Sequence, residues 1–189
     1  MDALLLALLL TLVLDQGTGT QRSVARLADA GTADTRHIGG LALMIAANAG
    51  VAAALGAVMA ALLMPDARLL FLAIALLIGG GSHLIAAFRK PPVTGAPPFR
   101  SRFRTLLTFA MRRAGENSAF ATAGVAAFTD APVLAAIGAM LGGWVALVPP
   151  LSLGSRYTRH GLLRLFQLLS GVILLCIAIA CAVNALRIV

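Results

Sequence analysis

Long apolar runs separated by short polar segments dominate this sequence. Hydrophobic residues make up 60% of the 189-residue chain, and the mean hydropathy is +0.94. A helix that crosses a bilayer needs about 20 predominantly apolar residues, and several of the runs reach or approach that length. The sequence therefore predicts an all-α, polytopic membrane protein. We expect six transmembrane helices at about residues 2–30, 38–64, 69–88, 105–129, 132–153 and 162–186.

Two polar segments interrupt apolar helices at corresponding places, 98 residues apart. When Gly17 is set on Gly115, each glycine has a charged residue two positions before it and a hydroxyl three positions after it. The charged residues are Asp15 and Arg113, and the hydroxyls belong to Thr20 and Ser118. We expect the first helix to be kinked or unwound at Gly17–Gly19 and the fourth to be broken at Gly115, with the two breaks meeting in one polar site.

The matching breaks divide the chain into two similar halves. Residues 1–88 hold three predicted spans, residues 89–104 form a basic, proline-rich linker, and residues 105–189 hold three more. An odd number of spans in each half turns the halves upside down relative to each other in the membrane. Two inverted three-helix repeats are a common plan of secondary transporters, which bind their substrate near the bilayer midplane on broken helices.

The basic residues indicate how the chain is oriented. The net charge of +8 does not predict nucleic-acid binding, because the basic residues lie between apolar runs and not on one face. With the N-terminus outside, Arg68 and Arg187 are outside, whereas eleven basic residues fall in the inside segments 21–37, 89–104 and 155–164. This bias follows the positive-inside rule. It predicts a multi-pass protein of the cell (inner) membrane with both termini outside.

The two breaks resemble the paired signature Glu-x-Gly-Asp-(Lys/Arg)-(Ser/Thr) of the GDT-one family (transmembrane-protein-165-like), and the resemblance covers nearly the whole chain. In the first copy Asp15 stands for Glu, Gly17 and Thr20 fit, and Thr18 and Gly19 replace the acidic and basic residues. In the second copy Gly115, Glu116 and Ser118 fit, whereas Arg113 replaces Glu and Asn117 the basic residue.

This resemblance implies two inverted three-helix repeats and transport of Mn²⁺ or Ca²⁺ across the membrane, coupled to protons. Two of the four expected carboxylates are present. Hard divalent cations prefer several oxygen ligands that include carboxylates. The predicted metal ligands are Asp15, Thr18, Thr20, Glu116, Asn117 and Ser118, and the predicted helix-breaking or packing residues are Gly17, Gly19 and Gly115.

Arg113 leaves the chemistry open, because it stays protonated under ordinary conditions. If it points into the site, it pairs with Asp15 or Glu116 and weakens binding of a divalent ion. If it turns toward Arg112, both carboxylates stay available. His83 is open in the same way: it is either a proton carrier or ligand, or a residue at the membrane interface.

Three functions therefore compete. The first is divalent cation transport, and the second is a non-transporting membrane scaffold or partner protein that keeps the fold. The third is transport of an anion or a small polar solute attracted by Arg113. We expect no enzymatic activity and no cofactor, since the sequence holds no nucleophile–base set, no His/Cys cluster with metal spacing and no phosphate loop. The expected partners are the lipid bilayer, a divalent cation and protons.

Overall fold

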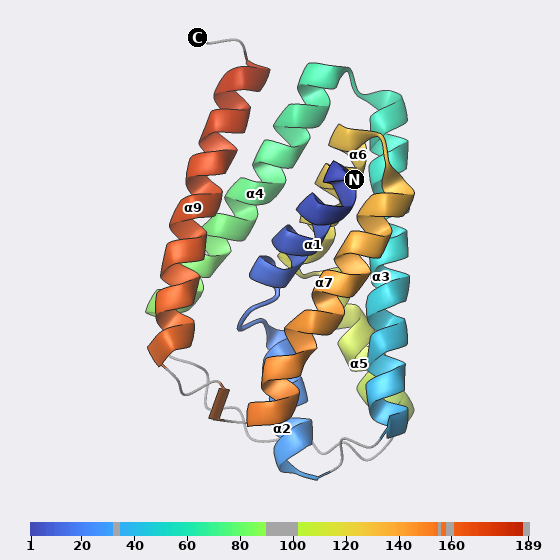
Figure 1. Ribbon diagram of the computed structural model, residues 1–189, viewed down its shortest axis with the longest axis vertical. Coiled ribbons are helices and arrows are strands. Elements are labelled where there is room, and N and C mark those ends of the chain that lie inside the picture. Colours follow the sequence, from blue (N-terminus) through green and yellow to red (C-terminus); the bar gives the residue numbers. More distant parts are fainter. Residues whose placement is uncertain (32–34, 90–101, 155, 158–160, 187–189) are drawn as a thin grey trace.

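The protein is all-helical in the residues that the computed structural model describes, which are 1–31, 35–89, 102–154, 156–157 and 161–186. Four long helices run along the long axis of the molecule, and the shorter ones lie between them (Figure 1). The helices are α1 (Asp2–Leu14), α2 (Gly19–Asp29), α3 (Thr35–Leu62), α4 (Pro65–Phe88), α5 (Arg102–Ala114), α6 (Asn117–Thr129), α7 (Pro132–Leu153) and α9 (Gly161–Ala185).

Four of these helices, α3, α4, α7 and α9, are long and apolar enough to cross a membrane. The pair of α1 and α2 counts as a fifth span if it is taken as one helix broken between Leu14 and Gly19, with a bend of 66°. The pair of α5 and α6 is not in this set, because α5 carries four arginines in 13 residues. The six-span count and the inversion of the two halves stay predictions.

Most helix boundaries follow the sequence signals. The predicted break of the first helix is confirmed, and α7 begins and ends where expected. α4 begins before the expected start at about residue 69: Pro65 occupies its first turn and Asp66 follows it. Both residues suit a helix N-terminus, since proline there loses no hydrogen bond and a carboxylate favours the positive end of the dipole. Of the linker 89–104, residues 90–101 lie outside the described part.

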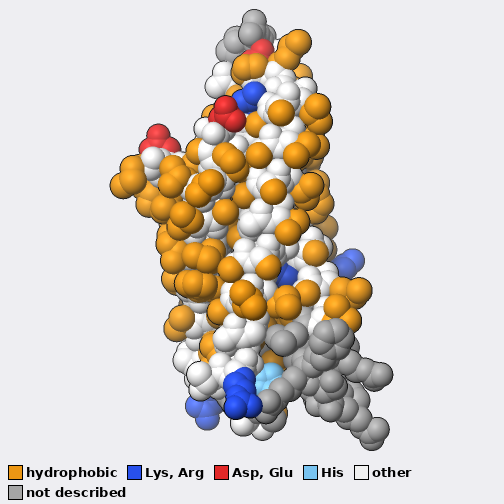
Figure 2. Space-filling view, turned by 90° about the vertical axis from the view of Figure 1, so that its right-hand side faces the viewer, with side chains coloured by type: hydrophobic (Ala, Val, Ile, Leu, Met, Phe, Trp, Pro, Cys, Tyr) orange, Lys and Arg blue, Asp and Glu red, His pale blue; other side chains and the backbone are white. Residues whose placement is uncertain are grey.

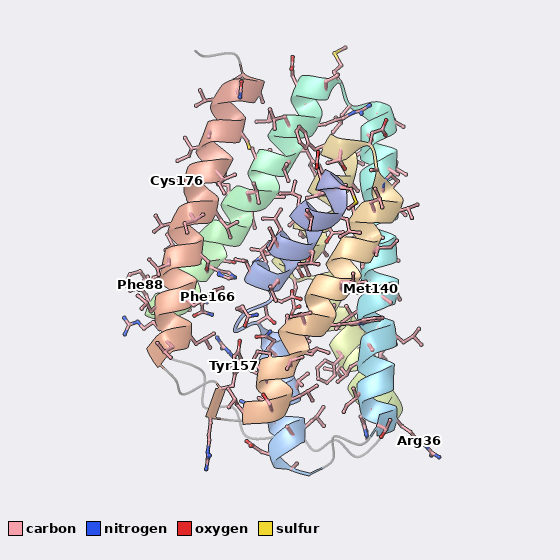
Figure 3. The ribbon with its side chains drawn as sticks, in the orientation of Figure 1. Arg36, Phe88, Met140, Tyr157, Phe166 and Cys176 are labelled. Atoms are coloured by element: carbon pink, nitrogen blue, oxygen red, sulfur yellow. The ribbon has the colours of Figure 1, made fainter. Side chains whose placement is uncertain are left out.

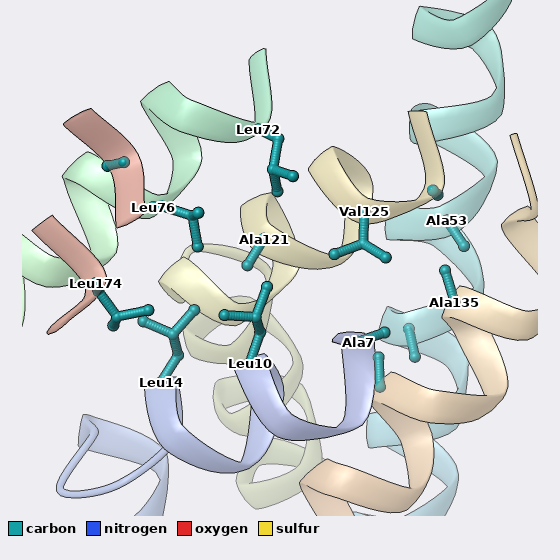
Figure 4. Packing of buried hydrophobic residues seen from close by; sticks show 14 residues of the cluster. Ala7, Leu10, Leu14, Ala53, Leu72, Leu76, Ala121, Val125, Ala135 and Leu174 are labelled. Carbon is teal, nitrogen blue, oxygen red and sulfur yellow. The ribbon is translucent and has the colours of Figure 1, made fainter. Parts of the chain in front are cut away.

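Small side chains fill the core and large apolar ones face outward. The main buried cluster joins α1, α3, α4, α6, α7 and α9 and is rich in alanine, with leucines such as Leu10, Leu14 and Leu76 between them (Figure 4). Leu43, Val51 and Leu62 are among the large apolar residues exposed on the surface. This distribution is typical of helices packed in lipid, where small residues let the backbones approach and large ones face the acyl chains.

Most of the surface seen in Figure 2 is apolar. Basic side chains lie at its lower end, both acidic and basic ones lie near its upper end, and some basic ones lie part-way up. Arg36 marks the lower end, where α3 begins and α2 lies (Figure 3). The described part of the chain therefore has the apolar middle and basic end of a membrane protein.

Glycines allow close contact between several pairs of helices. A Cβ added at Gly138 or Gly142 of α7 would collide with the backbone carbonyl of Leu4 or Leu8 of α1. The four-residue spacing repeats on both helices, so Gly138 and Gly142 together let α7 approach α1 closely. A Cβ at Gly56 of α3 would collide with the backbone of α6 in the same way.

We predict that Gly142→Ala destabilises the protein by about 1–3 kcal/mol, the usual cost of overpacking a close contact. The added methyl group would push α1 away from α7. Thermal unfolding of the purified protein in detergent measures the effect. Gly50→Ala is the matched control, because a Cβ at Gly50 meets nothing within 4 Å. Equal melting temperatures of the two variants would contradict the prediction.

Candidate functional site

The first break is a short loop between α1 and α2. α1 ends at Leu14, and Gly17 adopts a φ of 74°, a left-handed conformation that favours glycine. Thr18 then caps α2, its hydroxyl accepting a hydrogen bond from the backbone N–H of Gln21 at 3.4 Å. Gly19 is the first residue of α2, and a Cβ there would meet nothing within 4 Å. Of the two glycines, only Gly17 has a backbone reason to be glycine.

The second break is a shorter connection between two helices than the first. α5 ends at Ala114, Gly115 follows, and Glu116 is the N-cap residue of α6. The nearest atom to a Cβ on Gly115 would be the Arg112 carbonyl oxygen at 3.8 Å, so the local space would also accept a side chain. The break was predicted at the right place, but no steric contact in the described residues explains the glycine.

Arg113 joins the two breaks, which settles the direction of its side chain. Its Nη2 lies 2.6 Å from Asp15 Oδ2, and its Nη1 lies 3.0 Å from Glu116 Oε2. Asp15 is 1% exposed and Arg113 is 5% exposed, so the pairing takes place in the interior. We call Asp15, Arg113 and Glu116 the ion triad. Its formal charge is −1, since two carboxylates face one guanidinium.

Glu116 makes a second bond between the breaks. Its Oε1 accepts a hydrogen bond of 3.1 Å from the backbone N–H of Thr20, in the first turn of α2. Helix N-termini present free N–H groups and a partial positive charge, so a carboxylate is favoured there. Residues 96 positions apart in the chain are thus bound directly through the carboxylate predicted as a ligand.

A polar cavity of about 270 Å³ lies beside the triad. Both breaks line it, together with α4 and α9, and Glu116 is the triad member on its wall. The remaining polar lining comes from Gln16, Thr18, Arg22, Ser82, His83, Asn117 and Gln167. Of the predicted ligands, Thr18, Glu116 and Asn117 therefore face one cavity, whereas Asp15, Thr20 and Ser118 are buried outside its lining.

Gln21 holds the first break against α7. Its Oε1 accepts the N–H of Gly17 at 2.7 Å, and its Nε2 donates to the carbonyl of Ala146 at 2.5 Å. That carbonyl lacks its usual helical donor because Pro150, four residues later, has no N–H. The Tyr157 hydroxyl lies 2.6 Å from the same Gln21 oxygen. Burial raises the pKa of Tyr157 to about 12, so the phenol keeps its proton for this bond.

His83 is buried inside the helix bundle. It is 4% exposed and lies on the cavity wall. Its Nε2 is 3.2 Å from the carbonyl of Leu14, which is left free by the end of α1, and its Nδ1 is 2.9 Å from the Ser170 hydroxyl. Next to it, the Asn117 amide donates to the Ser82 hydroxyl at 2.5 Å. α4 is thus bonded to both breaks, and α9 is bonded to the first break through Gln167, whose Nε2 donates to the Gln16 carbonyl at 3.3 Å.

Sequence reasoning did not select Gln21, Tyr157 or Gln167 as site residues. One local signal existed: Pro150 frees the carbonyl of Ala146, which then requires a donor from elsewhere. The other partners depend on contacts more than 100 residues apart, such as that of Tyr157 with Gln21, and no spacing rule reveals them. Figure 3 shows Tyr157 beside the lower part of α7, on the side toward α9.

Across the described residues, no group of three or more His, Cys, Asp or Glu side chains is placed to hold a metal ion. The two carboxylates of the triad face a guanidinium, and the rest of the polar lining combines neutral oxygens with His83 and the positively charged Arg22. A scan against models of protein families found no match, and neither curated proteins nor solved structures gave one.

We predict that Gln21→Leu destabilises the protein more than Tyr157→Phe. The first change leaves the N–H of Gly17 and the carbonyl of Ala146 buried without partners, and each such group costs about 1–3 kcal/mol. The second removes a hydroxyl that lies 2.6 Å from the amide oxygens of both Gln21 and Gln16, and each amide keeps another hydrogen bond. Thermal unfolding in detergent compares the two variants, and a larger loss in Tyr157→Phe would show that Gln21 is not the central contact.

Proposed function

We propose that the protein is an integral membrane transporter that carries a divalent cation, Mn²⁺ or Ca²⁺, in exchange for protons. One observation supports this most: the two helix breaks meet so that the Glu116 carboxylate of one binds the backbone of the other beside a polar cavity. A carboxylate at broken helices within apolar spans is costly, and such groups usually serve transport or proton transfer. The likeness of both breaks to the GDT-one signature adds to this support.

Cation binding would begin at the cavity. Glu116 supplies one charged ligand there, and Thr18 and Asn117 supply neutral oxygens. Asp15 would join the site when Arg113 moves away from its carboxylate. Two carboxylates close together repel each other, so each binds a proton more readily when no cation lies between them. Protons and a divalent cation would therefore replace one another at the same pair of carboxylates.

The cavity lies toward the basic end of the molecule, where α2 lies and where α4 ends and α9 begins. On the other side of the breaks, the alanine-rich cluster of α1, α6 and α7 closes the path. We propose the orientation that the positive-inside rule favours, with the basic end inside the cell and both termini outside. In that orientation this conformation faces the inside, and rocking of one half against the other would expose the site outside.

The non-transporting scaffold is the second candidate, and two observations favour it. Arg113 already occupies the space between Asp15 and Glu116, at 2.6 and 3.0 Å. Arg22 adds a further positive charge to the cavity wall. In that function the triad is a permanent bond that locks the halves together. For transport of an anion or a polar solute, Arg22 would supply the attracting positive charge. Arg112 and Arg113 are not among the residues that line the cavity.

We predict that Mn²⁺ and Ca²⁺ enter proteoliposomes under an imposed pH gradient, and that Asp15→Asn and Glu116→Gln each reduce uptake to the level of empty vesicles. The triad loses a carboxylate in both variants. Asp130→Asn is the matched control, since Asp130 lies between α6 and α7 with a side chain that is 75% exposed. Asparagine also tolerates its left-handed backbone.

Uptake by the unmodified protein and by Asp130→Asn, but by neither triad variant, would support cation transport at the breaks. If the unmodified protein is folded but gives no uptake above that of empty vesicles, the result contradicts cation transport and supports the scaffold function.

A further inference from the structure

We infer that Arg113 is a tethered cation that occupies the position of the transported ion and competes with it for Asp15 and Glu116. The inference rests on the proposed function, because it concerns how the same site is filled and emptied. It assigns to Arg113 a direct control of cation affinity that a purely structural ion pair would not have.

The geometry of the triad supports this inference first. The two terminal nitrogens of one guanidinium face carboxylates from the two different breaks, at 2.6 Å and 3.0 Å. A bridging cation between two carboxylates has the same arrangement. Arg113 and Glu116 are three residues apart, so their pair is local, whereas the pair with Asp15 spans the two breaks.

Unpartnered buried polar atoms of the triad and of residues near it in sequence give independent support. Asp15 Oδ1, Thr11 Oγ1, Thr20 Oγ1 and Ser118 Oγ are fully buried and have no hydrogen-bond partner among the described residues, and Arg113 Nε also lacks one. Thr11 is one helical turn before Asp15, and Ser118 is two residues after Glu116. Native proteins leave few buried polar atoms unpaired. Arg113 thus offsets only one of the two carboxylate charges and leaves these oxygens unpaired, whereas a cation ligated by oxygen would bind such oxygens.

Space for the guanidinium exists because residue 143 is glycine. A Cβ there would lie 2.9 Å from Arg113 Nη2 and 2.7 Å from the Cγ2 of Ile45. Both distances are too short for a real Cβ, so any side chain at this position would press on the arginine. Gly143 therefore offers a way to displace Arg113 without removing a charge.

Binding of Mn²⁺ to purified protein in detergent tests the inference, read from the loss of the free Mn²⁺ signal in electron paramagnetic resonance. We expect Arg113→Gln to bind Mn²⁺ about tenfold more tightly than the unmodified protein, or better, because a competing positive charge is removed. Adding Glu116→Gln to this variant should abolish the gain. Methylguanidinium at millimolar concentration should compete with Mn²⁺ in Arg113→Ala, where it can take the vacated place.

Gly143→Ala is the second variant, because Arg113→Gln leaves Asp15 buried without its partner and risks failing to fold. It keeps all charges, and we expect tighter Mn²⁺ binding from it as well. Gly81→Ala is its control, since a Cβ at Gly81 meets nothing within 4 Å. Size-exclusion chromatography selects the folded variants.

The outcomes separate this inference from the transport function. If the unmodified protein takes up Mn²⁺ but neither folded variant binds it more tightly, Arg113 is not a competitor and the inference is wrong, while transport stands. If the variants gain Glu116-dependent binding but the unmodified protein shows no uptake, Arg113 occupies a cation site in a protein that does not transport, and the inference stands alone.

Discussion

The buried guanidinium of Arg113 is the interaction on which the two breaks depend. Without it, Asp15 would be an unpaired carboxylate at 1% exposure in an apolar bundle. Removing one partner of a buried ion pair costs about 3–5 kcal/mol, because the other charge is left uncompensated. The triad therefore fixes where the second break lies relative to the first, and the hydrogen bond from the Thr20 N–H to Glu116 follows from that position.

Helix breaks inside an apolar bundle leave backbone N–H and C=O groups without helical partners, and side chains nearby form hydrogen bonds with them. The carbonyl of Leu14 is reached by His83, the N–H of Gly17 by Gln21, and the N–H of Thr20 by Glu116. Lipid offers no water for such groups, so irregular backbone at this depth requires protein partners or a wet cavity. This requirement explains why so many polar side chains converge here in a chain that is 60% hydrophobic.

Local signals explain what the sequence could predict. Gly17 and the polar residues around it predicted the first break, and Pro132 and Gly154 bracket α7 as turn residues do. The direction of Arg113 could not be predicted, because it depends on Gly143 and Asp15, which are close only in the folded chain. His83 was open for the same reason: its position near a helix end suggested the interface, whereas its partners Leu14 and Ser170 hold it inside.

The contacts divide the helices around the polar site into two closely packed units, and a few hydrogen bonds join these units across the cavity. The first break is tied to α7 by Gln21 and by the glycines that let α1 approach, so α1, α2 and α7 form one unit. α4 and α9 form another, with Gly80 and Gly171 packed against each other. The cavity lies between these units, where His83 bonds to Leu14, Asn117 to Ser82 and Gln167 to Gln16. Each unit joins helices from both predicted halves, so rocking of one half against the other must break the contact of α1 with α7 and that of α4 with α9.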